Sequence, residues 1–166
     1  MFYSGFCLCD EEEIFHEYLP AFGSYVSGFS YGAIEALKYA LKEQSVKNLI
    51  LLSPAYYAHK EDAFKEAQLA AFESDKELYR LKLLKKSGFD ERERELYAKE
   101  GAYEELSELL YFDWNTARLE TLADRGVNIE VFIGSADSVV EPQASAEFFG
   151  RFAKVYTLKN KNHILR

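Results

Sequence analysis

Residues 24–37 read SYVSGFSYGAIEAL and place a G-x-S-x-G motif between a predicted strand and a predicted helix. The first six residues include the β-prone Tyr25, Val26 and Phe29, whereas residues 33–43 repeat apolar side chains at spacings of three and four, as helices do. The motif centres on Ser30, with Gly28 and Gly32 two residues to either side. A sharp strand-to-helix turn strains the serine backbone, and the glycines relieve the crowding around it. This stretch predicts either a nucleophilic serine or a tight turn without chemistry.

Short apolar runs bounded by turn signals alternate with helical segments, which is typical of an α/β fold with a mostly parallel sheet. The predicted strands cover residues 1–5, 24–29, 46–53, 127–134 and 153–158. Between the third and fourth of these, helix signals replace strand signals as far as Gly126. We expect one domain over residues 1–166, since a chain of this length can bury a real core. A helical lid, at about residues 55–115, is expected to be inserted in it.

Start and stop signals divide the helical segments. Residues 11–19 are predicted to form a first helix, with acids in its opening turn. Within the insertion, Ser74 and Glu77 have the spacing of a capping box and would begin a helix that ends at Gly88. Asp90 is expected to cap the next helix.

Composition limits the classes of function. The chain has a formal net charge of -8, which argues against a nucleic-acid partner. No apolar run is long enough to span a membrane, and the N-terminus lacks the features of a signal peptide, so a cytoplasmic protein is expected. Cys7 and Cys9 have no partnering Cys or His motif, which predicts free thiols, no metal site and no cofactor.

A nucleophilic serine needs a base, and the chain has three histidines. His16 falls in the first predicted helix and His59 at the start of the insertion, where an exposed or core-edge position is expected. His163 follows the last predicted strand. Because parallel strands end at one edge of a sheet, His163 is expected on the same side as Ser30. The alternative is a C-terminal histidine without a task.

The carboxylate that orients the base is predicted to be Asp137, three residues after the fourth strand ends at Gly134. Asp113 and Asp124 belong to the helical insertion and are worse placed. A turn-capping role is the alternative for Asp137, since the surrounding SADS sequence suits a turn. Tyr31 would lie at the N-terminus of the following helix, so its backbone N–H could face an oxyanion that develops at Ser30.

The Ser, Asp, His order, the elbow GFSYG, the stretch VFIGSADSVV and the terminal NHILR together resemble the α/β-hydrolase fold, here reduced to about five strands. More narrowly, FYSGF, VSGFSYGAIEAL, SPAYYAHK and NIEVFIG resemble BioV-type pimeloyl-acyl carrier protein methyl ester esterases. The likeness runs over nearly the whole chain.

The resemblance implies hydrolysis of the methyl ester of pimeloyl-acyl carrier protein in biotin biosynthesis. Ser30 would be the nucleophile, His163 the general base and Asp137 its orienting carboxylate. The second oxyanion donor is expected to be the Phe6 backbone N–H, although Ser4-Gly5-Phe6-Cys7 lacks the H-G-x-G pattern of many relatives. Two alternatives are a general small carboxylesterase or acyl-protein thioesterase with the same triad, and a non-catalytic binding module of the same fold.

An acidic carrier protein requires a local basic surface on a chain of this charge. The insertion contains one candidate basic cluster and one candidate apolar channel for the acyl chain. A solvated helix face is the alternative for the basic cluster, and core packing is the alternative for the apolar residues. The cluster consists of Arg80, Lys82, Lys85 and Lys86, and the channel of Leu106, Leu109, Leu110 and Phe112. The segment 151–166 adds five basic residues and no acidic one.

Overall fold

A computed structural model describes all residues from Met1 to Arg166. Its centre is a five-stranded sheet in the order β1-β2-β3-β4-β5, and every neighbouring pair is parallel. The strands are β1 (Phe2–Tyr3), β2 (Tyr25–Phe29), β3 (Asn48–Leu52), β4 (Asn128–Gly134) and β5 (Lys154–Leu158). All five predicted strands are confirmed, with slightly shorter bounds.

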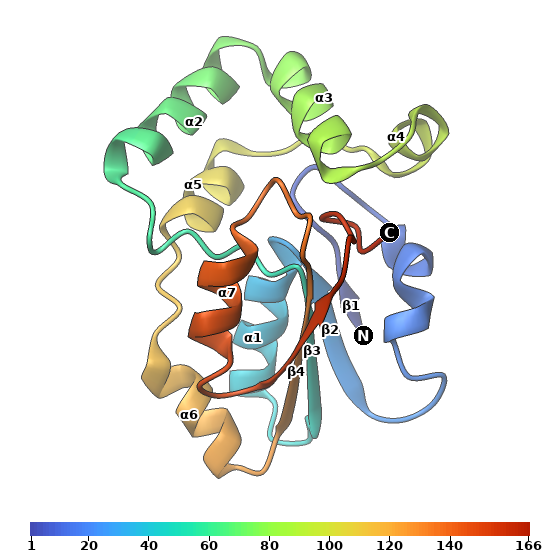
Figure 1. Ribbon diagram of the computed structural model, residues 1–166, viewed down its shortest axis with the longest axis vertical. Coiled ribbons are helices and arrows are strands. Elements are labelled where there is room, and N and C mark those ends of the chain that lie inside the picture. Colours follow the sequence, from blue (N-terminus) through green and yellow to red (C-terminus); the bar gives the residue numbers. More distant parts are fainter.

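The chain forms eight helices. They are η1 (Glu11–Tyr18), α1 (Gly32–Lys42), α2 (Asp62–Ser74), α3 (Lys76–Ser87), α4 (Glu91–Tyr97), α5 (Tyr103–Tyr111), α6 (Thr116–Asp124) and α7 (Pro142–Phe149). Figure 1 shows α2, α3 and α4 beyond one end of the strands, whereas α6 lies beside α1 at the opposite end. The stretch between β3 and β4, residues 53–127, is called the helical insertion below.

Both faces of the sheet are buried, as expected for parallel strands. In β3, Leu49 and Leu51 pack into a core with α1, α6 and α7, while Ile50 and Leu52 pack on the other face against η1. This period of two explains why β3 reads as a continuous apolar run in the sequence. A third apolar cluster joins the carboxyl ends of the strands to α2 and α5.

The helix predicted after Asp10 is confirmed as η1, a 3₁₀-helix whose three-residue period places Glu11 and Ile14 on the same buried side. One local prediction is wrong. Helix α3 is capped by Asp75 and not by Ser74, because Asp75 has the extended backbone of a cap and its carboxylate accepts from the Leu78 N–H at 2.9 Å. The predicted Gly88 stop and Asp90 cap are confirmed, and the structure adds that Asp90 and Glu93 form a capping box.

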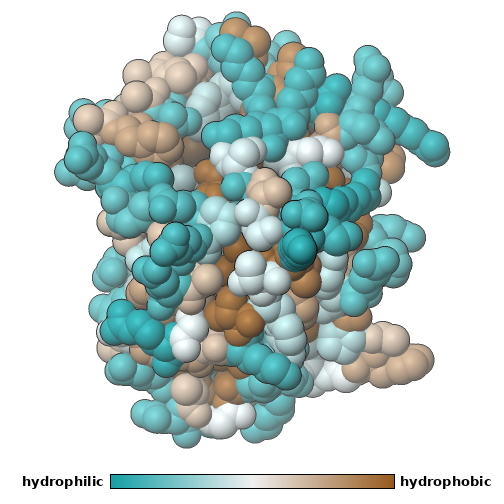
Figure 2. Space-filling view, viewed as in Figure 1, coloured by the Kyte–Doolittle hydropathy of each residue, from teal (hydrophilic) through white to brown (hydrophobic).

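The surface is mostly polar on the face shown in Figure 2, with strongly apolar residues visible near its centre and at its upper end. No helix has the length and apolar character that crossing a membrane requires.

Candidate functional site

Ser30 follows β2 directly and has a positive φ of 53°, as a nucleophile elbow requires. Its backbone is held on both sides, which lets a strained conformation persist. The Ser30 N–H donates to the Leu52 carbonyl at 2.9 Å, and the Ser30 carbonyl accepts from the N–H groups of Ala33 and Ala55, each at 3.2 Å. The side chain is therefore presented at the carboxyl edge of the sheet by a fixed turn.

Gly28 and Gly32 are required by close backbone packing. A Cβ atom on Gly28 would lie 2.0 Å from the Gly32 carbonyl oxygen, and a Cβ on Gly32 would lie 2.0 Å from the Tyr3 carbonyl oxygen. Neither backbone neighbour can move away as a flexible side chain would. The predicted steric role of both glycines fits this geometry.

The structure brings His163 and Asp137 together from the ends of two strands. The Nδ1 atom of His163 lies 2.6 Å from Asp137 Oδ2, and both side chains are buried. The other carboxylate oxygen, Oδ1, accepts from the N–H groups of Val139 at 2.7 Å and Val140 at 3.1 Å. A carboxylate accepts only, so Nδ1 is the protonated nitrogen of the neutral ring and Nε2 keeps a free lone pair.

Ser53 also positions His163. It follows β3 with a φ of 42°, and its buried hydroxyl donates to the His163 carbonyl at 2.7 Å. The sequence reasoning missed this role, although Ser53 directly follows β3, at the same sheet edge as Ser30. A polar residue directly after a buried strand was the available signal.

The two expected oxyanion donors have free backbone N–H groups. Neither Phe6 nor Tyr31 donates its amide to another protein group. The Tyr31 side chain points elsewhere, since its hydroxyl donates to Glu108 of α5 at 2.9 Å. Burial and this contact raise the pKa of Tyr31, so its ring is an uncharged anchor between the elbow and the insertion.

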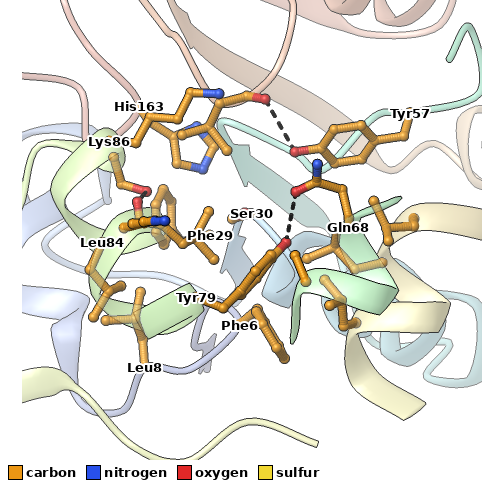
Figure 3. Close-up of a pocket in the computed structure, with 18 of the residues that line it drawn as sticks. Phe6, Leu8, Phe29, Ser30, Tyr57, Gln68, Tyr79, Leu84, Lys86 and His163 are labelled. Atoms are coloured by element: carbon orange, nitrogen blue, oxygen red, sulfur yellow. Dashed lines mark hydrogen bonds between the residues drawn. The ribbon is translucent and has the colours of Figure 1, made fainter. Parts of the chain in front are cut away.

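Ser30 and His163 line one cavity, whose volume is about 260 Å³. Its wall is mainly apolar and includes Phe6 as well as side chains from α2, α3 and α5. In Figure 3, the rings of His163, Tyr57 and Tyr79 surround the position of Ser30. The structure contains no hydrogen bond between the Ser30 hydroxyl and His163, and such bonds often tighten only when substrate binds.

Three of the four residues predicted to form the apolar channel line the cavity. Leu106, Leu109 and Leu110 line it, whereas Phe112 packs edge-on against Trp114 in the core beside the sheet. Phe112 follows the last residue of α5, where the chain turns back toward α6, so its inclusion in the channel is wrong.

The predicted basic cluster divides into two parts. Lys82 and Lys86 line the cavity. Arg80 instead donates to Glu77 and to the Lys99 carbonyl, and Lys85 lies outside the cavity wall. Positions 82 and 86 are one helical turn apart, which explains why these two lysines share a face of α3.

The other two histidines lie outside the cavity wall. His16 contacts the Glu13 carbonyl, and His59 lies 3.1 Å from Glu141. Cys7 and Cys9 are free, and burial raises the pKa of Cys7 to about 12, which leaves its thiol uncharged. No group of three or more His, Cys, Asp or Glu side chains is arranged to hold a metal ion.

No protein-family model and no curated protein sequence matches this chain. Solved structures do. An esterase from Exiguobacterium antarcticum matches with a TM-score of 0.63 and 16% identity over 84% of this chain and 59% of its own. BioG from Haemophilus influenzae matches with a TM-score of 0.60 and 14% identity over 99% of this chain and 87% of its own. A carboxylesterase from Nitrososphaera gargenis matches with a TM-score of 0.57 and 15% identity over 84% of this chain and 57% of its own.

The chain therefore spans less than two thirds of the first of these proteins and most of BioG. At these identities the likeness concerns the fold. The five parallel strands and the helices around them have the arrangement of the α/β-hydrolase fold.

Proposed function

We propose that this protein is a serine carboxylesterase that hydrolyses the methyl ester of pimeloyl-acyl carrier protein and releases methanol. The observation that supports an esterase best is the arrangement at one sheet edge: Ser30 at positive φ, in one cavity with His163, whose Nδ1 atom bonds to Asp137. The narrower substrate rests on the resemblance to BioV-type esterases, and the expected setting is biotin biosynthesis in the cytoplasm.

The reaction follows from the roles of these groups. His163 Nε2 removes the proton from the Ser30 hydroxyl as the oxygen attacks the ester carbonyl. The amides of Phe6 and Tyr31 stabilise the oxyanion, and the protonated His163 then donates its proton to the departing methanol. Asp137 keeps the ring oriented and stabilises its positive charge. Water, activated by the same histidine, hydrolyses the acyl-serine.

The cavity suits an apolar acyl chain. Its volume of about 260 Å³ lies near the lower end of the range for small-molecule sites, roughly 300–1,000 Å³. Three leucines of α5 supply much of the apolar wall, so we propose that the helical insertion acts as a lid over the chain. Lys82 and Lys86 form no ion pair within the protein and leave two positive charges for an acidic carrier.

Substrate comparison tests this function. The value of kcat/KM for the carrier-bound methyl ester should exceed that for a short free methyl ester by about 100-fold, because remote contacts supply binding energy that the free ester lacks.

Replacing both Lys82 and Lys86 by glutamate, which reverses their charge, should raise KM for the carrier-bound ester about tenfold relative to KM for the free ester.

Lys85→Glu is the matched control, since Lys85 lies on the same helix but outside the cavity wall. Its effect on the ratio of KM values should be under about threefold. Equal kcat/KM for the two wild-type substrates would instead favour a general carboxylesterase.

A further inference from the structure

Glu11 is a buried acid that the reaction above does not use. It is the first residue of η1, its side chain is wholly inaccessible, and one of its oxygens, Oε1, accepts from the Gly5 N–H at 2.7 Å. The other oxygen, Oε2, is buried and makes no hydrogen bond of standard geometry, although the Ser4 hydroxyl and the N–H of Glu11 itself interact with the carboxyl and lower its pKa. A buried polar atom left unpaired costs free energy, so its presence calls for a reason other than stability.

The hydrogen bond from Gly5 lies in the loop that contains the Phe6 amide. Gly5 to Leu8 form a tight turn, in which the Leu8 N–H donates to the Gly5 carbonyl at 3.1 Å. Cys7 occupies the third position of this turn with a φ of 62°, a positive value like that of the third residue of a type II turn, and one that is strained for a residue other than glycine. The turn needs outside contacts to stay in this form.

Glu11 and Leu8 together fix the direction of the Phe6 N–H. The Gly5 carbonyl and the Phe6 N–H belong to one planar trans peptide, so they point in opposite directions. The Leu8 N–H holds the carbonyl of the Gly5–Phe6 peptide. Glu11 holds the N–H of the preceding peptide, Ser4–Gly5. Phe6 itself lines the cavity with Ser30, and its N–H donates to no protein group (Figure 3).

We propose that Glu11 is a positioning residue: by holding the Ser4–Gly5 peptide through the Gly5 N–H, it fixes one side of the turn, so that the Phe6 N–H in the next peptide faces the oxyanion formed when Ser30 attacks an ester. This inference rests on the proposed function. Burial raises the pKa of Glu11, while the hydrogen bond from Gly5 opposes that rise. Both protonation states of the carboxyl retain an oxygen that accepts from Gly5, so the role requires an acceptor rather than a charge.

Three substitutions test the inference on a free methyl ester. Glu11→Gln keeps an acceptor at the same reach, Glu11→Leu has similar size without an acceptor, and Glu11→Asp is too short by one methylene group. Glu11→Gln should keep kcat within about threefold of wild type. Glu11→Leu should lower kcat about 30-fold and leave KM within about threefold, because the Phe6 N–H stabilises the oxyanion only in the transition state. If Glu11→Leu does not fold, Glu11→Asp provides the same comparison.

Binding of an alkylboronic acid, which forms a tetrahedral adduct with a serine, supplies a second readout. Its affinity should fall in parallel with kcat, while the affinity for an unreactive ester analogue stays unchanged. Wild-type kcat in both Glu11→Leu and Glu11→Asp, or an equal loss in Glu11→Gln, would overturn the inference. A folded wild-type protein without esterase activity would contradict the proposed function instead.

Discussion

His163→Ala should lower kcat for ester hydrolysis by about four orders of magnitude or more, with the fold retained. The imidazole is the group in the cavity that can take the Ser30 proton, and without it the hydroxyl is a poor nucleophile at neutral pH. The members of a triad act as one unit, so the loss should be near that of Ser30→Ala. Steady-state kinetics on a free methyl ester, with thermal unfolding of each variant, measures both effects.

His59→Ala is the matched control for this substitution. His59 contacts Glu141 outside the cavity, and it is absent from the cavity wall. Its replacement should leave kcat within about threefold of wild type. Activity of His163→Ala near the wild-type value would mean that another group is the base.

Gly32→Ala should destabilise the protein by about 3 kcal/mol or more. Helix propensity alone predicts the opposite sign, because alanine is favoured over glycine in a helix by about 1 kcal/mol. Steric overlap dominates here: the new Cβ would lie 2.0 Å from the Tyr3 carbonyl oxygen and 2.6 Å from that of Ser4, both on the backbone at the end of β1. Denaturant unfolding measures the change in free energy of unfolding.

Gly126→Ala provides the comparison for Gly32→Ala. Gly126 has a φ of 75°, but a Cβ atom added there would meet no other atom within 4 Å, so alanine should cost only about 1 kcal/mol. Equal stability of Gly32→Ala and wild type would contradict the packing described for the elbow.

The sheet and its edge were predictable because their signals are local. Each strand is a short apolar run, and the rule that parallel strands end at one edge linked Ser30, Asp137 and His163 without any knowledge of distances. The structure places Asp137 and His163 in hydrogen-bond contact and His163 in the same cavity as Ser30.

Residues whose roles depend on tertiary packing could not be identified in this way. Glu11 is one of three consecutive glutamates, and only the three-residue period of η1 distinguishes the buried one from its exposed neighbours. Ser53 acts through the backbone of His163, which is distant in sequence. Charge alone could not separate Lys82 and Lys86 from Arg80 and Lys85, because the cavity determines which face of α3 is used.

Covalent labelling of Ser30 tests the account most directly. A fluorophosphonate probe reacts with a serine that is activated by a neighbouring base, and mass spectrometry of the intact and digested protein locates the adduct. We expect one adduct, on Ser30, in the wild-type protein, no adduct in Ser30→Ala, and labelling slowed by at least about 100-fold in His163→Ala. Folded wild-type protein that remains unlabelled, or an adduct that persists in Ser30→Ala, would contradict the claim that Ser30 is the nucleophile of an esterase.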